Sequence, residues 1–505
     1  MIRGASAARR LTTPSRHRSI GGYGPWTTHR NPSTPVGRWS STSSSTPDLI
    51  EELEQRGLIA TLTSRALRTH LHTAPRTVYS GVDPSADSLH VGNLLPLLTL
   101  AHFARFNHNP IVLVGGATGS IGDPSGRSSE RNALDKTTLE GNVEAIKGQL
   151  RKFFDNVQEW YRVEQGYSRR TAEEAGGVEL GMGVRMMNNY DWMNNISLLD
   201  FLCSVGRHAR LTHMLARESV ASRLQPSPTS SSSSNGMSYT EFSYQLLQAY
   251  DFSFLHTNHS CTIQIGGSDQ LGNITAGIDL IRRLQTLTTH HPAYGLTLPL
   301  LTTHTGEKFG KSAGNAVWLS PLKTSDWHFY QFFLRTTDQD VARYLRCLTL
   351  LTPHTVDEII AQHATTPRSR LAQQTLASHM THLIRGKQAA QKCQSLSHLL
   401  FSHTTTTNLV GSNDPVEAAK LALSKLDVAM LKEEGDDLLA RLPRGQVVGA
   451  DVAKLAVGAG LVKSRGEARR LWKSGGLYVN NQQQGVGTGR GWCGGRIWWR
   501  GGRAC

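Results

Sequence analysis

The sequence is poor in the features that mark membrane proteins, disulfide-stapled domains and zinc sites. No apolar run approaches the roughly 18 residues that a membrane-spanning helix needs. The six cysteines lie far apart, and no two of them form a C-x-x-C pair. This spacing argues against a zinc site or a disulfide framework and fits a reducing compartment. We therefore expect no membrane partner and no bound metal.

Acidic residues are absent from the first 47 positions, which instead contain seven arginines and many serines and threonines. This composition is typical of a transit peptide that directs a protein into an organelle. A disordered basic tail that contacts RNA is the alternative. We predict that residues 1–47 are a mitochondrial transit peptide, so the mature protein would work in the mitochondrial matrix. A chloroplast is the less favoured destination.

Positive charge is in excess well beyond this segment. The formal net charge is +15, and removing the seven N-terminal arginines leaves +8 (15 − 7). Clustered lysines and arginines bind phosphates of a polyanion by releasing counterions. A basic targeting segment joined to an ordinary domain would explain only part of the excess. The remaining charge favours a polyanionic partner for the mature protein.

Strands and helices alternate through the first two thirds of the chain. Strand-like runs cover residues 76–82, 110–114 and 261–265, and helical patterns cover 89–106 and 269–284. Such alternation predicts parallel βαβ units, and therefore an α/β fold with a Rossmann-like parallel sheet. The other expectations are a helical stretch at 48–70, a strand at 297–302, irregular chain at 155–185, a low-complexity loop at 225–236 and an almost wholly helical region after 335.

Two short motifs carry groups that can contact phosphate. His90 and Asn93 are three residues apart where a helix is expected to open, so both would project from its first turn beside free N–H groups. Gly92 between them removes a side chain where a ligand could approach the backbone. Lys308 and Lys311 are likewise three apart, in a glycine-containing loop. Taken alone, the histidine could be a helix cap and the lysines an exposed basic hairpin.

Two further motifs place polar groups at the edge of the predicted sheet. A strand followed by a glycine pair would bring Asp269 and Gln270 to the carboxyl edge, where α/β folds bind ligands. Tyr244, Gln248 and Asp251 are spaced i, i+4 and i+7, so they lie on one face of a helix. Three polar groups on one face are an unusual choice for a stripe that only packs against a core.

Together these motifs resemble the signatures of class I aminoacyl-tRNA synthetases. The stretch ending in His90–Asn93 is similar to their His-Ile-Gly-His motif, and Lys308–Ser312 is similar to Lys-Met-Ser-Lys-Ser. Asn93 replaces the second histidine, Phe-Gly replaces Met-Ser, and Leu271 stands where tryptophan is common. The blocks that resemble bacterial and mitochondrial tyrosyl-tRNA synthetases specifically are Gly115–Gly126, Tyr244–Asp251 and Gly266–Gly277, in family order.

The resemblance implies a role for each candidate residue in a reaction that uses tyrosine, ATP with Mg²⁺ and tRNA(Tyr), with no bound organic cofactor. The implied phosphate-contacting catalytic residues are His90, Asn93, Lys308, Lys311, Arg127 and Arg131. The implied tyrosine-binding residues are Tyr79, Asp123, Tyr244, Gln248, Asp251, Gln264 and Gln270. The implied ATP- or adenylate-binding residues are Gly81, Asp83, His90, Gly92, Asn93, Gly267, Asp269 and Lys311.

A basic unit near the C-terminus resembles the small RNA-binding fold, named for a ribosomal protein, that these synthetases carry. Its clustered cations would form a basic helix face suited to RNA phosphate, although a merely solvated face is the alternative. These cations are Lys463, Arg465, Arg469, Arg470 and Lys473. The predicted domains are thus a catalytic domain at 48–335, a helical anticodon-arm domain at 336–444, an α+β RNA-binding domain at 445–484 and an atypical Gly/Arg/Trp tail at 485–505.

The sequence leaves two other interpretations open. Some fungal mitochondrial members of the family act in group I intron splicing, and the irregular stretch at 155–185 invites the same possibility as a secondary role. Tryptophanyl-tRNA synthetases share the fold, but the Tyr244, Gln248 and Asp251 pattern favours tyrosine. A homodimer is expected from the resemblance.

Overall fold

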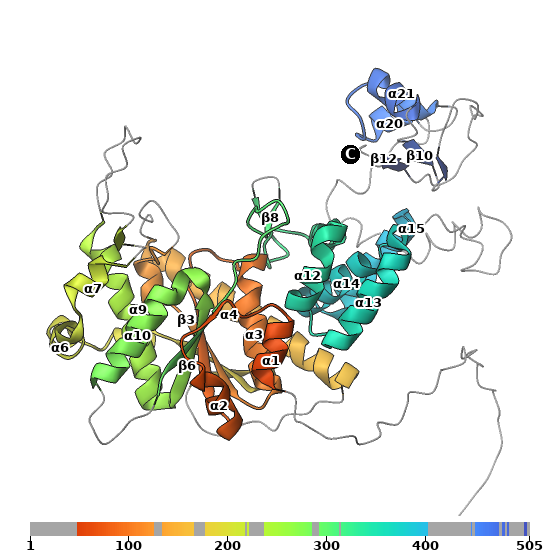
Figure 1. Cartoon of the computed structure of the whole chain (residues 1–505). Coiled ribbons are helices and arrows are strands. Elements are labelled where there is room, and N and C mark those ends of the chain that lie inside the picture. The colour runs from red at the N-terminus through yellow and green to blue at the C-terminus, as the bar shows by residue number, and fades with distance from the viewer. Residues whose placement is uncertain are drawn as a thin grey trace, which may run out of the picture. The chain divides into compact units, whose positions relative to one another are not determined.

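Most of residues 48–401 and a small C-terminal unit are described by the computed structural model shown in Figure 1. The predicted transit peptide and the low-complexity loop at 225–236 lie outside the described residues. The described residues are 48–125, 134–165, 177–217, 220–221, 237–284, 292–312, 315–401, 446, 450–473, 477–479, 482–483 and 499–501.

A seven-stranded sheet forms the centre of the α/β region, in the order β1-β7-β6-β2-β3-β5-β4. The five inner strands run parallel to one another, and the two edge strands pair antiparallel. The predicted α/β, Rossmann-like sheet is confirmed. The strands are β1 (Thr61–Leu62), β2 (Thr77–Val82), β3 (Asn109–Val114), β4 (Val178–Leu180), β5 (Val184–Asn188), β6 (Cys261–Gly267) and β7 (Tyr294–Leu298).

Helices cover both faces of this sheet, because successive side chains of each strand point to opposite faces. Val78 and Val112 belong to a core cluster with α3 and α4, whereas Tyr79 and Ile111 belong to a second cluster with α9 and α10. Figure 1 shows α9 and α10 side by side next to β6. These four helices are α3 (Leu94–Arg105), α4 (Lys136–Gln165), α9 (Tyr239–His259) and α10 (Leu271–Leu284).

Shorter helices accompany the main ones. The helical stretch expected at 48–70 forms two helices separated by the short strand β1. The first helix ends because the chain turns at Gly57, whose φ of +69° favours glycine. The short helices are α1 (Leu49–Gln55), α2 (Ala66–Thr73), α5 (Tyr190–Met193), α6 (Leu198–Ser204) and α7 (Leu211–Leu215).

Three other sequence-based expectations need correction. The helix expected from residue 89 begins at Leu94, because a short 3-10 turn at Val91–Asn93 comes first. The strand expected at 297–302 ends at Leu298. Irregular structure at 155–185 is wrong for the described part, since α4 continues through Gln165 and β4 and β5 follow. Buried Phe154, Val157 and Tyr161 recur at helical spacing and carry α4 through this stretch.

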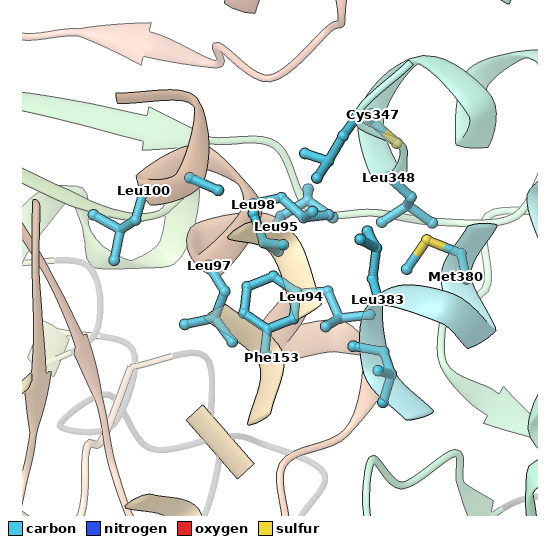
Figure 2. Packing of buried hydrophobic residues seen from close by; sticks show 14 of the residues in the cluster. Leu94, Leu95, Leu97, Leu98, Leu100, Phe153, Cys347, Leu348, Met380 and Leu383 are labelled. Atoms are coloured by element: carbon cyan, nitrogen blue, oxygen red, sulfur yellow. The ribbon is translucent and has the colours of Figure 1, made fainter. Parts of the chain in front are cut away.

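Five helices follow the α/β region and share its hydrophobic core. Leu94 and Leu98 of α3 and Phe153 of α4 pack in one cluster with Leu348 and Met380, as Figure 2 shows. No break in packing therefore accompanies the domain boundary predicted at 335. The helices are α11 (Asp326–Leu334), α12 (Asp338–Leu348), α13 (Pro353–Thr365), α14 (Leu371–Arg385) and α15 (Lys387–Phe401).

The C-terminal unit combines two helices with a small sheet. Ala453, Ala456, Val462 and Ala468 form its buried cluster. Strand β12 (Trp499–Gly501) lies in the atypical tail predicted at 485–505, and it pairs with β10. The remaining elements are α20 (Val452–Gly458), α21 (Arg465–Lys473), β10 (Leu477–Val479) and β11 (Gln482–Gln483).

None of the described helices combines the length and the apolar character that crossing a membrane requires.

Candidate active site

A cavity of about 620 Å³ opens at the carboxyl ends of β2 and β6. This edge of a parallel sheet is where α/β folds bind ligands. The cavity brings together residues that lie up to about 230 positions apart in the chain, between Tyr79 and Lys308. The predicted site residues that line it are Tyr79, Gly81, Asp83, His90, Gly92, Asn93, Asp123, Tyr244, Gln248, Asp251, Gln264, Gly267, Asp269, Gln270 and Lys308.

Three predicted residues are not placed in this way. Arg127 and Arg131 lie outside the described residues. Lys311 begins the short strand β8 (Lys311–Ser312), and its side chain is likewise outside the description. The roles of these three residues remain predictions.

A buried polar pair marks one end of the cavity. The Tyr79 side chain is 1% exposed, and its hydroxyl has no hydrogen-bond partner among the described residues. Asp251 is 3% exposed, and burial raises the pKa of its carboxyl to about 8. Burial, and then the charge of Asp251, also raise the pKa of the Tyr79 hydroxyl well above its usual value. An unpaired buried hydroxyl of this kind is costly unless a ligand satisfies it.

Two residues that sequence analysis missed hold Asp251 in place. Asn189 Nδ2 and Trp192 Nε1 each donate to one carboxyl oxygen of Asp251 at 2.9 Å. Both follow β5 and come shortly after the stretch at 155–185 that is expected to be irregular. Reading Val184–Asn188 as a buried strand would have placed Asn189 at the carboxyl edge of the sheet.

The glycine-rich stretch after β3 packs directly against Asn189 and Asp83. Asn189 Oδ1 accepts from the backbone N–H of Ala117 at 2.8 Å, and its Nδ2 also donates to Thr118 Oγ1 at 3.0 Å. A Cβ atom at Gly115 would lie 2.4 Å from Asp83 Oδ1. Glycine is required at this position because any side chain would displace the Asp83 carboxylate.

The middle of the cavity is rich in hydrogen-bond acceptors. Tyr244 donates its hydroxyl to Asp83 Oδ2 at 2.8 Å, and burial followed by the Asp83 charge raises the Tyr244 pKa well above its usual value. Gln248 Nε2 donates to Gln270 Oε1 at 3.1 Å, and Gln270 Nε2 donates in turn to Asp123 Oδ2.

The acceptor atoms left over in this network favour a cationic ligand. The Oε1 atoms of Gln248 and Gln264 are buried without a hydrogen-bond partner among the described residues. The carboxylates of Asp83 and Asp123 line the same cavity. A group with several N–H donors and a positive charge, such as an ammonium, would satisfy these oxygens.

His90 caps the turn that begins α3. Its Nδ1 accepts from the Gly92 N–H at 3.0 Å, and Asn93 Oδ1 accepts from the His90 N–H at 3.0 Å. Burial lowers the pKa of His90, which favours the neutral ring. Because Nδ1 accepts, the proton of the neutral ring resides on Nε2 and is the donor that remains for a ligand. Capping and phosphate contact are therefore compatible roles.

The two lysine positions lie on a hairpin, which we call the lysine loop (residues 301–312). The Phe309 N–H donates to Leu301 O at 2.9 Å and closes the hairpin, while Lys308 beside it is exposed. Phe309 is buried and packs 4.6 Å from the ring centre of Tyr344. At Gly310, where φ is +94°, a Cβ would lie 2.6 Å from Val91 Cγ2. The loop therefore rests directly on the turn next to His90.

Within the described residues, no group of three or more histidine, cysteine, aspartate or glutamate side chains is arranged to hold a metal ion. The cavity instead has a deep end built for a hydroxyl, an acceptor-rich centre and an outer end with His90 and Lys308. This order of groups along the cavity suits an amino acid bound next to the phosphate of a nucleotide.

Comparison with known proteins agrees with this arrangement. Residues 71–402 match the family of class I tRNA synthetases for tryptophan and tyrosine (tRNA synthetases class I, W and Y). The tyrosine–tRNA ligase of Roseiflexus castenholzii is 41% identical over 437 residues, covering 86% of this chain and 91% of that enzyme. The mitochondrial tyrosine–tRNA ligase of Saccharomyces cerevisiae is 42% identical over 364 residues, covering 72% and 71%.

Solved structures give the same answer. A C-terminally truncated mitochondrial tyrosyl-tRNA synthetase of Aspergillus nidulans superimposes with a TM-score of 0.61 at 33% identity, covering 70% of this chain and 94% of that one. The equivalent enzyme of Coccidioides posadasii gives 0.58 at 33% identity, covering 69% and 91%. The chain thus belongs to the class I tRNA synthetases of the tryptophan and tyrosine group. Within that group it is a member of the tyrosyl-tRNA synthetases.

Proposed function

We propose that this ATP-dependent tyrosine–tRNA ligase makes tyrosyl-adenylate in the cavity between Tyr79 and Lys308 and then transfers tyrosine to the 3′ end of tRNA(Tyr). The observation that supports this site most is the pairing of an unsatisfied buried hydroxyl with a fixed carboxyl at the deep end. The tyrosine side chain fits such a pair, because its apolar ring can be buried while its terminal hydroxyl forms hydrogen bonds with both groups.

The substrate tyrosine would bind with its ring between the central sheet and α9, which carry Tyr79 and Asp251. Its phenol hydroxyl would exchange hydrogen bonds with Tyr79 and Asp251. Phenylalanine would leave the buried Tyr79 hydroxyl without a partner and would take away the additional hydrogen bond of Asp251. An unsatisfied buried polar group costs about 1–3 kcal/mol. The ammonium would lie among the carboxylate of Asp123, the hydroxyl of Tyr244 and the amide oxygen of Gln248, with Gln264 and Gln270 nearby.

The first chemical step needs no general base, because the tyrosine carboxylate is already ionised. A carboxylate oxygen forms a bond to the α-phosphorus of the Mg²⁺–ATP substrate, and the bond from that phosphorus to the bridging oxygen breaks. Pyrophosphate leaves with the bonding pair. Catalysis then depends on aligning the groups and stabilising charge on the phosphoryl oxygens.

The outer end of the cavity would supply that stabilisation. His90 Nε2 and the Asn93 amide would donate to phosphate oxygens, and Lys308 and Lys311 would neutralise the departing pyrophosphate. Arg127 and Arg131 are proposed as additional phosphate contacts. The residues proposed to hold the adenylate are Gly81, Asp83, Gly92, Gly267 and Asp269.

The second step would use the C-terminal unit to hold the RNA. A ribose hydroxyl at the tRNA 3′ end attacks the carbonyl carbon of the adenylate, and AMP leaves. The five predicted RNA-binding cations are all exposed around α21, which suits contact with backbone phosphates. These residues are Lys463, Arg465, Arg469, Arg470 and Lys473.

A homodimer is proposed through the apolar surface of α6 and α7. Leu198 and Leu199 are 72% and 73% exposed, and Leu211 is also exposed. Exposed apolar side chains that lie together in this way mark a protein–protein interaction site. Cys203 is exposed on the same helix and offers a probe. Sedimentation of the Leu198→Asp, Leu199→Asp double variant should give monomers, and an unchanged dimer would exclude this surface.

The mitochondrial matrix is proposed as the site of action. Support comes from the acid-free N-terminal composition and from the similarity to mitochondrial enzymes of yeast and filamentous fungi. A reporter carrying residues 1–47 should enter mitochondria, and a cytosolic reporter together with cytosolic full-length protein would overturn the proposal. The splicing role stays a prediction, and residues 155–165 and 178–185 of the stretch that suggested it form the end of α4, β4, the start of β5 and the 3-10 turn between these strands.

One assay tests the catalytic proposal as a whole. ATP–pyrophosphate exchange should occur with tyrosine and not with the other nineteen amino acids. Exchange with tryptophan instead of tyrosine would show that the deep end has been assigned to the wrong side chain. Absence of exchange with any amino acid would show that the cavity does not make an adenylate.

A further inference from the structure

A short segment, residues 317–320, connects the two phosphate-contacting motifs. The Val91 N–H donates to Val317 O at 3.0 Å, and the Leu319 N–H donates to Leu89 O at 2.7 Å, so the segment pairs on both sides of His90. The Val317 N–H also donates to Gly310 O of the lysine loop at 2.9 Å. The spacing between His90 and the lysine loop therefore depends on the position of this segment as well as on the direct contact of Gly310 with Val91.

One buried arginine from the helical region holds the other edge of the segment. Arg385, the last residue of α14, is 6% exposed. Its Nη1 donates to Leu319 O, and its Nη2 donates to Trp318 O at 3.3 Å and to Thr324 O at 2.7 Å. Its Nε lies 3.0 Å from Asp326 Oδ1, which offsets the buried charge.

Arg385 does not line the cavity between Tyr79 and Lys308. We propose that Arg385 is a positioning residue for tyrosine activation: by holding the carbonyls of Trp318 and Leu319, it fixes the spacing of His90 and the lysine loop around the ATP phosphates. This inference rests on the proposed phosphate contacts of His90 and Lys308.

The guanidinium group suits this position for a geometric reason. Its five N–H donors lie in a fixed plane, so one side chain can hold three carbonyls and face a carboxylate at the same time. A lysine has three donors on a single atom and reaches fewer of these acceptors. Without the arginine, three carbonyls would lose a donor and residues 317–320 would be free to shift. Misplacement of reacting groups by about 1 Å can slow a reaction by about a hundredfold.

The tyrosine end of the cavity should not respond to this change. Tyr79 lies on β2 and Asp251 on α9, and Asp251 is held by Asn189 and Trp192. None of these four residues takes part in the hydrogen bonds described for residues 317–320. The positioning role therefore predicts a change in the use of ATP without a change in the recognition of tyrosine.

Arg56 provides a matched control. It is 2% exposed and donates to the carbonyls of Arg346, Thr349 and Leu351 at 3.2, 3.0 and 2.7 Å. It also forms an ion pair with Glu52 at 2.8 Å. Like Arg385 it is a buried arginine that joins the α/β region to the helices, but its contacts lie at the end of α12 and away from residues 317–320.

The test compares R385Q, R385K and R56Q in the full-length chain by pyrophosphate exchange, with the folded fraction measured by thermal unfolding. Per folded molecule, R385Q should lose about tenfold to a hundredfold in kcat and raise the KM for ATP, with the KM for tyrosine unchanged. R385K should recover part of the loss, and R56Q should keep kcat.

Two outcomes would overturn the proposal. Equal losses per folded molecule in R385Q and R56Q would make Arg385 a general structural residue. A higher KM for tyrosine with an unchanged KM for ATP would place its effect at the wrong end of the cavity. Because His90→Ala tests the phosphate contacts directly, a failure of the Arg385 proposal can be told apart from a failure of the proposed function.

Discussion

The two ends of the cavity are built by different means. At the tyrosine end, Asp251 is buried and both of its oxygens accept from rigidly placed side chains, Asn189 and Trp192. At the phosphate end, His90 is set by a cap and by backbone pairing, and Lys308 is exposed on a hairpin. Selection between two similar amino acids requires fixed groups that a wrong ligand leaves unpaired. Stabilising the charge that develops as pyrophosphate leaves requires donors and cations directed at the phosphate oxygens.

The largest effect is expected from a change at the phosphate end. Replacing His90 with alanine should lower kcat for pyrophosphate exchange by roughly 10²–10³-fold, the usual cost of one donor to a developing anion. The dissociation constant for tyrosine should hardly change, because Tyr79 and Asp251 are untouched. Stopped-flow measurement of adenylate formation separates the two quantities.

A second variant at His90 separates its cap from its phosphate contact. In His90→Asn, the side-chain oxygen can still accept from the Gly92 N–H, as asparagine does at many helix starts. The Nε2 donor is lost. Full activity in His90→Asn would reduce the role of His90 to capping, and loss of tyrosine affinity at an unchanged activation rate would place His90 at the wrong end.

A change at the tyrosine end should affect the selectivity between amino acids more than the rate of tyrosine activation. Asp251→Asn should reduce the preference for tyrosine over phenylalanine by roughly 5-fold to 150-fold, the range set by leaving one buried polar group unpaired. The ratio of kcat/KM values for the two amino acids measures this. Trp192→Phe, which removes one donor to Asp251, should give a smaller change in the same direction. If both amino acids weaken equally, Asp251 is a packing residue.

A change outside both ends should separate activation from charging. Deletion of residues 445–505 should leave pyrophosphate exchange nearly intact and lower aminoacylation by roughly tenfold, since the lost cations attract RNA phosphate. The slope of log affinity for tRNA against log salt should become shallower by about 3.5–4.5 units for five lost contacts. Equal losses in both assays would make the segment a general stabiliser, and no loss in either would remove its RNA-binding role.

The last expected effect concerns stability instead of activity: a pH dependence that originates at the tyrosine end. Burial raises the pKa of Asp251 from its ordinary 3.8 to about 8 in the folded protein. The folded state therefore holds one proton more than the unfolded state between these values, and Asp251 makes stability fall as pH rises from about 4 to about 8. Urea unfolding across this range should show a flatter profile for Asp251→Asn than for the unchanged protein. Parallel profiles would mean that Asp251 does not hold this proton.

The sequence predicted the parts of the site that lie on regular elements. Tyr244, Gln248 and Asp251 share a helix face because 3.6 residues complete one turn, and the structure places all three on one cavity. Tyr79 and Gln264 lie on neighbouring parallel strands in direct register. Local periodicity determines such positions, so they can be found before a structure is known.

Long-range contacts explain what was missed. Asn189 holds Asp251 across 62 positions, and Arg385 reaches Leu319 across 66. No local pattern marks either pair, because their geometry follows from how whole elements pack. The cap formed by His90 and Asn93 is local, yet it was read as a full helical turn because a 3-10 start and an α-helical start share the same residue preferences.

The shared core beneath α3, α4 and α14 limits where the chain can be divided. A fragment that stops at residue 335 would leave Leu94, Leu98 and Phe153 without the side chains of Leu348 and Met380 that cover them in Figure 2. Newly exposed apolar surface of this kind promotes aggregation. Residues 48–401 should therefore melt in a single cooperative transition, and expression trials for a minimal activating enzyme should begin with fragments that extend beyond α14.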